Sequence, residues 1–251
     1  MPASADPPTD DHAIGFVADG LRLAGVLHLP SRPPWAVIIG CHGLMADKQS
    51  PKQIALARYC KAAGMAYFRF DHRGCGESQG NFETDTTLAR RRCDLLAAAG
   101  EMGGRLGGSM PIGLFGSSLG GAVCLAAAAQ VAPFAVVTLA APVHSHSIRL
   151  PENAPPSLEA ELRQGRLSFN VSTPIPAIDH ILVIHGSCDQ IVPIDNARTI
   201  FQMAAQPKRE LILPGGDHRI SRPGHQRRFI EAAVAWFVAC RDRRATEAGD
   251  R

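Results

Sequence analysis

The segment Gly116-Ser117-Ser118-Leu119-Gly120 constrains the fold of this chain more than any other. The apolar run at 111–115 predicts a short buried strand before it, and the Ala-rich run that starts at 121 predicts a helix after it. A strand that turns directly into a helix brings the two backbones almost into contact, so only glycine fits on either side of the turn. We therefore expect the Ser118 hydroxyl above a sheet edge and at a helix N-terminus, where negative charge is favoured.

Strand and helix patterns alternate along most of the chain. Apolar runs predict strands at 14–17, 21–29, 36–39, 66–70, 111–115, 134–139, 181–184 and 210–213. Helical patterns cover 51–64, 84–102, 195–205 and 223–240, besides the helix after Ser118. This alternation predicts an α/β fold, with a mostly parallel twisted sheet that has helices on both faces.

A single domain of residues 13–241 accounts for this alternation. Residues 1–12 are rich in Pro and Asp and predict a disordered N-terminal tail, and 242–251 are expected to form a C-terminal tail. Residues 144–179 interrupt the alternation with a Pro-, Ser- and His-rich stretch that has one short helical pattern near 158–164. This stretch predicts a short cap or lid insert, and a plain surface excursion is the alternative.

Composition excludes several classes of function. A formal net charge of +3 on 251 residues gives no reason to expect nucleic acid or a membrane surface as a partner. Short basic clusters such as Arg90-Arg91-Arg92 are interpreted as solvated faces. The seven cysteines are scattered without a Cys-x-x-Cys pair, which argues against a disulfide framework and against a metal site. No cofactor is predicted.

Two segments of the sequence bear on the cellular location of the protein. The N-terminus has neither the basic region nor the apolar core of a signal peptide. The longest apolar stretch, 124–143, is broken by Gln130 and Pro133 and so predicts a helix followed by a strand rather than a membrane span. We expect a cytoplasmic protein, and the sequence specifies no oligomeric state.

A serine hydroxyl becomes a good nucleophile only when a base takes its proton and a carboxylate orients that base. Two loops that follow predicted strands offer these groups. Asp189 follows the strand at 181–184, and His218 follows the strand at 210–213 in a Gly-rich loop. Asp189 is preferred over Asp195, which is interpreted as a helix N-cap, and over Asp217, which is adjacent to His218.

Acyl transfer also requires donors for the oxyanion that forms. The backbone N–H of Leu119, directly after Ser118, is one candidate. Resemblance to the α/β-hydrolases implies that the other lies in the loop after the strand at 36–39, where we predict the Leu44 N–H, with that of Met45 as the alternative. His42, in the same loop, is interpreted as a residue that holds the loop by hydrogen bonds.

Together these segments resemble the α/β-hydrolase superfamily. Ser118 occupies the family's nucleophile elbow, Gly-x-Ser-x-Gly, and the order Ser118, Asp189, His218 is the family's order. The loop at 71–78, Asp-His-Arg-Gly-Cys-Gly-Glu-Ser, is similar to the family's Asp-x-Arg-Gly-x-Gly-x-Ser loop, and its glycines suit tight turns. The resemblance extends from about residue 14 to 240 and is greatest to small-capped carboxylesterases of the feruloyl or cinnamoyl esterase type.

The resemblance implies a serine hydrolase that cleaves carboxylic esters through an acyl-enzyme, with a small-molecule ester as substrate. A thioesterase, a serine peptidase or an acyltransferase would use the same chemistry. A non-catalytic binding module on the same fold is a further alternative. Dehalogenases and epoxide hydrolases are disfavoured, because these relatives carry Asp where this chain has Ser118.

Overall fold

A computed structural model describes residues 11–150 and 156–249 of the chain. Its centre is an eight-stranded sheet with the order β1-β2-β4-β3-β5-β6-β7-β8. The strands are β1 (Asp11–Ala18), β2 (Leu21–His28), β3 (Val37–Cys41), β4 (Ala66–Phe70), β5 (Ile112–Ser117), β6 (Ala135–Leu139), β7 (Ile181–Gly186) and β8 (Lys208–Leu213). The pairs β1-β2 and β2-β4 are antiparallel and the others are parallel, so β3 to β8 all end at the same edge.

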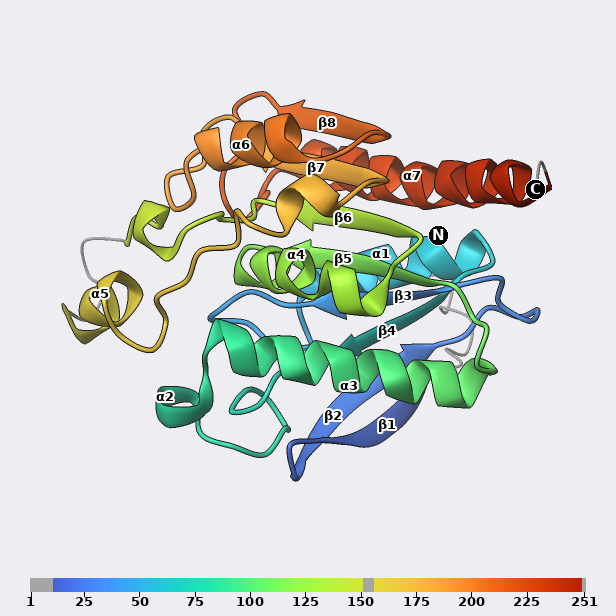
Figure 1. Cartoon of the computed structure of the whole chain (residues 1–251), viewed down its shortest axis with the longest axis horizontal. Coiled ribbons are helices and arrows are strands. Elements are labelled where there is room, and N and C mark those ends of the chain that lie inside the picture. Colours follow the sequence, from blue (N-terminus) through green and yellow to red (C-terminus); the bar gives the residue numbers. More distant parts are fainter. Residues whose placement is uncertain (1–10, 151–155, 250–251) are drawn as a thin grey trace, which may run out of the picture.

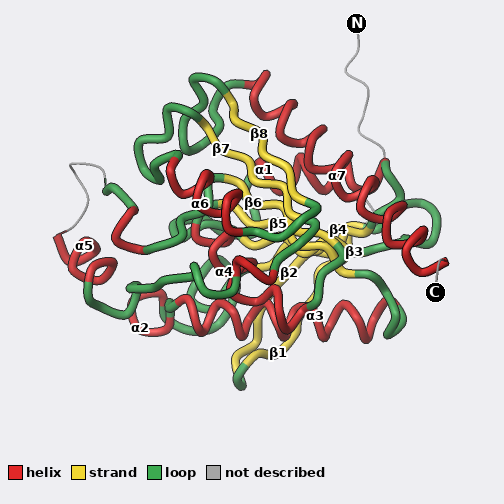
Figure 2. Tube along the Cα trace, turned by 45° about the horizontal axis from the view of Figure 1, so that its top comes forward, coloured by secondary structure: helices red, strands yellow, loops and turns green. Residues whose placement is uncertain are grey.

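Helices cover both faces of this sheet. They are α1 (Pro51–Ala62), α2 (Phe82–Asp85), α3 (Leu88–Leu106), α4 (Leu119–Val131), α5 (Pro156–Arg163), α6 (Asp195–Met203) and α7 (Pro223–Gly249), with short 3-10 helices at Ser145–Ser147 and Ile175–Ala177. In Figure 1, α3, α4 and α6 lie in front of the sheet and α1 and α7 behind it. Figure 2 shows α3 and α7 on opposite sides of the strands. The α/β-hydrolase fold expected from the sequence is confirmed.

The central strands are apolar throughout because both of their faces are covered. Every residue of β3, β4 and β6 is buried. Side chains alternate between faces along a strand, so Val37 and Ile39 pack toward α3 and α4, whereas Ile38 packs toward α1 and α7. Two apolar cores result, one on each face. They hold the carboxyl edge of the sheet rigid beneath the loops that follow β3, β5, β7 and β8.

Several element boundaries differ from the prediction. The helix expected at 84–102 is two helices, because Asn81 caps α2 and Thr87 caps α3 with side-chain oxygens that accept backbone N–H groups. α7 continues to Gly249 through residues expected to be a tail, since no glycine or proline interrupts 225–248. β1 begins at Asp11, so two residues of the expected N-terminal tail are strand.

The rest of that predicted tail, residues 1–10, lies outside the described residues, as do 151–155 of the predicted cap and 250–251. The described part of the cap contains α5, which Figure 1 shows beyond the carboxyl ends of the central strands. Among the helices of residues 11–150 and 156–249, none combines the length and the apolar character that crossing a bilayer requires.

Candidate active site

Ser118 lies on a sharp turn between β5 and α4. Its φ of 54° is in the left-handed region that a residue with a side chain rarely adopts, so the turn is strained. The flanking glycines permit it: a Cβ at Gly116 would lie 2.3 Å from the Gly120 carbonyl oxygen, and one at Gly120 would lie 2.2 Å from that of Cys41. The hydrogen bond from the Ser118 N–H to the Leu139 oxygen, at 2.8 Å, fixes the turn to β6.

Asp189 lies in the loop after β7, and its carboxylate is held from two sides. Oδ1 accepts hydrogen bonds from the backbone N–H groups of Ile191 at 2.9 Å and Val192 at 2.8 Å. Oδ2 faces His218, whose Nδ1 lies 2.8 Å away. The short loop thus leaves one oxygen of the Asp189 carboxylate to face the histidine.

His218 lies between Asp189 and Ser118. Its Nε2 is 3.1 Å from Ser118 Oγ, while its Nδ1 contacts the carboxylate. If Nδ1 donates to Asp189, Nε2 is left as an acceptor for the serine hydroxyl. The Asp189 side chain is fully buried, and that of His218 is 19% exposed. The structure therefore brings together three side chains, with His218 lying 29 positions after Asp189 and 100 positions after Ser118.

The Asp189 carboxylate stays ionised despite its burial. Burial alone would raise its pKa, but hydrogen bonds from His185 and His218 outweigh this effect and hold the pKa of Asp189 well below its usual range. His185 Nε2 lies 3.3 Å from Asp189 Oδ2 and 2.8 Å from the Val192 carbonyl oxygen, so it is a donor to both. A permanent negative charge therefore faces the His218 ring.

The loop after β3 passes directly beside Ser118. A Cβ on Gly43 would lie 3.4 Å from Ser118 Cβ and 4.0 Å from its Oγ, so the Gly43-Leu44 peptide borders the serine. The backbone N–H groups of Leu44 and Leu119 have no hydrogen-bond acceptor within residues 11–150 and 156–249. Leu119 opens α4, where the first N–H groups of a helix lack an internal partner.

His42 holds this loop, as its place in the sequence suggested. Its Nε2 accepts the backbone N–H of His72 at 3.1 Å, so its Nδ1 carries the proton and donates to the Gly43 oxygen at 2.7 Å. Burial, reinforced by the nearby Arg91 charge, lowers the pKa of His42 well below its usual range, so the ring is neutral. His42 therefore acts as a fixed neutral brace between the loops after β3 and β4.

The loop at 71–78 is tied down by Asp71. Its carboxylate accepts the Lys48 backbone N–H and the Lys48 ammonium, both at 2.6 Å, and the Glu77 backbone N–H at 2.9 Å. Gly76, with φ of 52°, passes so close that a Cβ there would lie 2.2 Å from Asp71 Oδ2. The carboxylate thus fixes loop geometry, in agreement with the structural role that we assigned to this loop.

Two charged side chains near the site were not predicted from the sequence. Arg91, which we interpreted as part of a solvated basic cluster, is fully buried against the loop at 43–44. Its helical spacing with the apolar Leu95, Ala98 and Met102 places it on the buried face of α3, and that spacing was the available signal. Lys52 Nζ lies 3.3 Å from the side-chain oxygen of Ser117, and burial lowers the pKa of Lys52.

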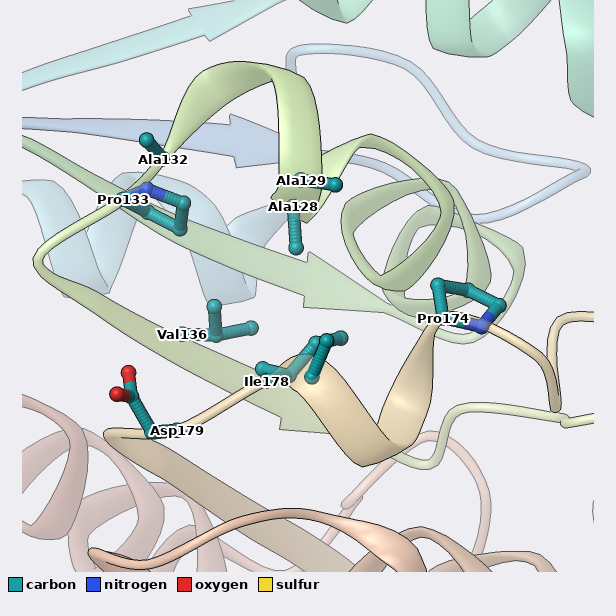
Figure 3. A pocket seen from close by; sticks show the side chains of 9 residues that line it. Ala128, Ala129, Ala132, Pro133, Val136, Pro174, Ile178 and Asp179 are labelled. Atoms are coloured by element: carbon teal, nitrogen blue, oxygen red, sulfur yellow. The ribbon is translucent and has the colours of Figure 1, made fainter.

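A pocket of about 240 Å³ lies at the amino edge of the parallel strands, opposite the carboxyl edge that holds Ser118. It is bordered by Ala128 at the end of α4, Val136 near the start of β6 and Ile178 before β7 (Figure 3). None of its lining residues is a serine, cysteine or histidine. The groups that could carry out acyl transfer therefore lie at the carboxyl edge, away from this pocket.

Comparisons with known proteins bear on the family of this chain. Residues 32–168, more than half of the chain, match the family Hydrolase_4, described as serine aminopeptidase, S33. Palmitoyl-protein thioesterase ABHD10, mitochondrial, from Mus musculus is 26% identical over 210 residues, which are 73% of this chain and 69% of that protein. The chain spans about half the length, 48%, of two other curated relatives.

Solved structures share the fold. Est1E from Butyrivibrio proteoclasticus with bound ferulic acid superposes with a TM-score of 0.76 at 22% identity, over 90% of this chain and 98% of that one. The esterase domain of a Rhodothermus marinus protein gives a TM-score of 0.70 at 27% identity, over 92% and 98%. On the family match and the shared architecture, the chain belongs to the Hydrolase_4 family of α/β-hydrolases.

Proposed function

We propose that this protein is a serine hydrolase that cleaves carboxylic ester bonds, with Ser118 as nucleophile, His218 as general base and Asp189 as the group that orients it. The observation that carries the proposal is the pair of hydrogen bonds on the two His218 nitrogens, at 3.1 Å to Ser118 and 2.8 Å to Asp189. In these roles the residues convert an unreactive hydroxyl into a nucleophile.

In the proposed reaction, Ser118 Oγ attacks the ester carbonyl carbon while its proton passes to His218 Nε2. The carbonyl oxygen becomes an oxyanion, which the backbone N–H groups of Leu119 and Leu44 would stabilise. When the intermediate collapses, His218 returns the proton to the departing alcohol and leaves an acyl group on Ser118. Water, deprotonated by His218, then attacks the acyl carbon. When this second intermediate collapses, the bond to Ser118 Oγ breaks, His218 returns the proton to that oxygen, and the acid is released. The ionised Asp189 stabilises the imidazolium in each half of the reaction.

We further propose that the insert expected at 144–179 caps the carboxyl edge of the sheet through its described residues before Pro174, because Pro174 and Ile178 border the pocket at the opposite edge. The segment is anchored on both sides: the Ser147 hydroxyl donates to Asn196 Oδ1 on α6, and Arg166 Nη1 donates to the Thr86 oxygen near α3. It therefore spans from α6 to the start of α3, across the ends of the central strands. In that position its side chains would shape the acyl or alcohol pocket.

A thioesterase is the second candidate, because a relative named as a palmitoyl-protein thioesterase matches 73% of this chain. The same residues would attack a thioester carbonyl, and only the leaving group changes from an alcohol to a thiol. A series of p-nitrophenyl esters from acetate to octanoate, run beside acyl-CoA and S-acyl peptide thioesters, separates the two. We expect the higher kcat/KM on the oxygen esters.

Covalent labelling tests the nucleophile directly. A fluorophosphonate should add one equivalent to the wild-type protein at Ser118, as located by peptide mass spectrometry, and should not label Ser118→Ala. The neighbouring Ser117→Ala is the matched control and should label like the wild type, because its hydroxyl contacts Lys52 rather than His218. Equal labelling of Ser118→Ala and the wild type would falsify the assignment.

A further inference from the structure

Arg91 lies beneath the Gly43-Leu44 peptide. It comes from the first turn of α3 and is fully buried. Its Nη1 donates to the Gly43 carbonyl oxygen and its Nη2 to the Leu44 carbonyl oxygen, both at 3.2 Å. Nη2 also lies 3.3 Å from the Cys75 sulfur. The two guanidinium nitrogens thus hold two consecutive carbonyls of the loop that borders Ser118.

This guanidinium has no carboxylate partner in the part of the chain that the structure describes, and its Nε has no hydrogen-bond acceptor there. The nearest acid on the same helix, Asp94, is bound instead to Arg73 at 2.7 Å and to His72 at 3.3 Å. A buried cation is costly unless it is paired, and here the loop carbonyls and Cys75 are its partners. The positive charge of Arg91 therefore acts mainly on the carbonyl groups of the loop after β3.

The Gly43 carbonyl and the Leu44 N–H belong to one peptide group. Because that group is planar and trans, the two bonds point in opposite directions. Fixing the Gly43 oxygen toward Arg91 therefore aims the Leu44 N–H away from α3. The same oxygen also accepts from His42 Nδ1 at 2.7 Å, so two donors hold it. The second contact of Arg91, on the Leu44 oxygen, fixes the Met45 N–H in the same way.

We propose that Arg91 is a positioning residue that aims and polarises the Leu44 N–H, so that this donor is in place before an oxyanion forms. The inference rests on the proposed function. Donors on a carbonyl oxygen polarise the whole peptide group and strengthen its N–H as a donor. A donor that is already oriented needs no reorganisation during the reaction, which is the condition under which it stabilises a transition state best.

The test compares binding of a transition-state mimic with binding of a ground-state analogue. A trifluoromethyl ketone adds to a reactive serine and carries an oxyanion, whereas a matched ether has no carbonyl to accept a hydrogen bond. Removing one oxyanion donor costs about a hundredfold to a thousandfold in turnover. For Arg91→Met, which misaligns the donor without deleting it, we expect kcat to fall about tenfold to a hundredfold by the same principle.

In Arg91→Met, the affinity for the ketone should fall by the same factor as kcat. The affinity for the ether and the KM should stay within about twofold of the wild type, because the interaction is made only in the transition state. Arg91→Lys keeps the charge and should lose less than Arg91→Met. Arg90→Met, an exposed neighbour on α3, controls for the loss of an arginine. Arg69→Met controls for loss of a buried guanidinium that bonds the Lys48 carbonyl instead.

Several results would overturn the positioning role of Arg91. Wild-type ketone affinity in Arg91→Met, or equal loss of ketone and ether binding, overturns the inference. Selective ketone loss in Arg69→Met overturns it too, because destabilisation alone would then explain the effect. If Arg91→Met does not fold, the comparison uses Arg91→Lys, for which an unchanged ketone affinity is the contrary result. A wild-type protein that neither cleaves esters nor binds the ketone refutes the proposed function, and this role with it.

Discussion

The stability of the protein should depend on pH through His72, whose ring is fully buried behind the candidate site. Burial lowers the pKa of His72 from 6.5 to about 4, although the hydrogen bond to Asp94 opposes this effect. The charges that face the ring are Arg91 and Asp94 from α3 and Asp71 from its own loop. The folded protein therefore keeps His72 neutral at pH values where the unfolded chain protonates it.

The sign and size of the pH effect on the free energy of unfolding follow from this difference in His72 protonation. Below pH 6.5 the unfolded state binds more protons than the folded state, so the free energy of unfolding falls as the pH falls. The contribution is fully present above pH 6.5 and is lost down to about pH 4. At about 1.4 kcal/mol per pKa unit, the change amounts to about 3 kcal/mol. The neutral His42 ring, whose pKa is also lowered by burial, adds a change of the same sign.

The perturbation is His72→Asn, because the Asn amide can keep a donor near the Nδ1 position that faces Asp94 at 3.3 Å. Urea denaturation followed by circular dichroism, at half-unit steps from about pH 4.5 to 7.5, gives the free energy of unfolding. Between these limits we expect the variant to lose about 2 to 3 kcal/mol less than the wild type.

His12→Asn, at the exposed start of β1, controls for the loss of a histidine as such. Its stability should follow the wild-type pH dependence. Parallel curves for His72→Asn and the wild type would refute the reasoning, because a ring that stays neutral in the folded state cannot be removed without changing proton uptake on unfolding.

Two further predictions concern the candidate site. Asp189→Asn should lower kcat about ten-thousandfold with little change in fold, because an amide favours the wrong tautomer of His218; steady-state kinetics on the best ester measures it. Gly120→Ala should destabilise the protein by more than about 2 kcal/mol, since its Cβ would lie 2.2 Å from the Cys41 oxygen; thermal denaturation measures it.

Each of these predictions has a control that makes the same substitution at a position with a different environment. Asp195→Asn, at the exposed start of α6, should retain wild-type kcat, and a loss as large as that of Asp189→Asn would contradict the assigned role. Gly103→Ala lies in α3 where an added Cβ meets nothing within 4 Å, so it should stabilise by about 0.5 to 1 kcal/mol. A Gly120→Ala variant as stable as the wild type would show that the turn yields to a side chain.

Local patterns in the sequence predicted most of the elements of the fold. Apolar runs set the strands because a strand covered on both faces must be apolar throughout, and β3, β4 and β6 are. One boundary that differed depended on side-chain caps. The helical pattern at 84–102 predicts a single helix, but the caps Asn81 and Thr87 divide it into α2 and α3. The candidate residues Ser118, Asp189 and His218 could be found because each follows a strand, and parallel strands end at one edge.

The sequence by itself thus determined which elements form and which side chains reach the carboxyl edge. The tertiary structure alone decided the distances among Ser118, Asp189 and His218, which depend on loops from three different strands. It also decided what the Arg91 guanidinium contacts, although the helical spacing of Arg91 with Leu95 could have indicated its burial. Only the packing of α3 against the loop after β3 buries that guanidinium beneath two carbonyls, because burial is a property of neighbours that are distant in the chain.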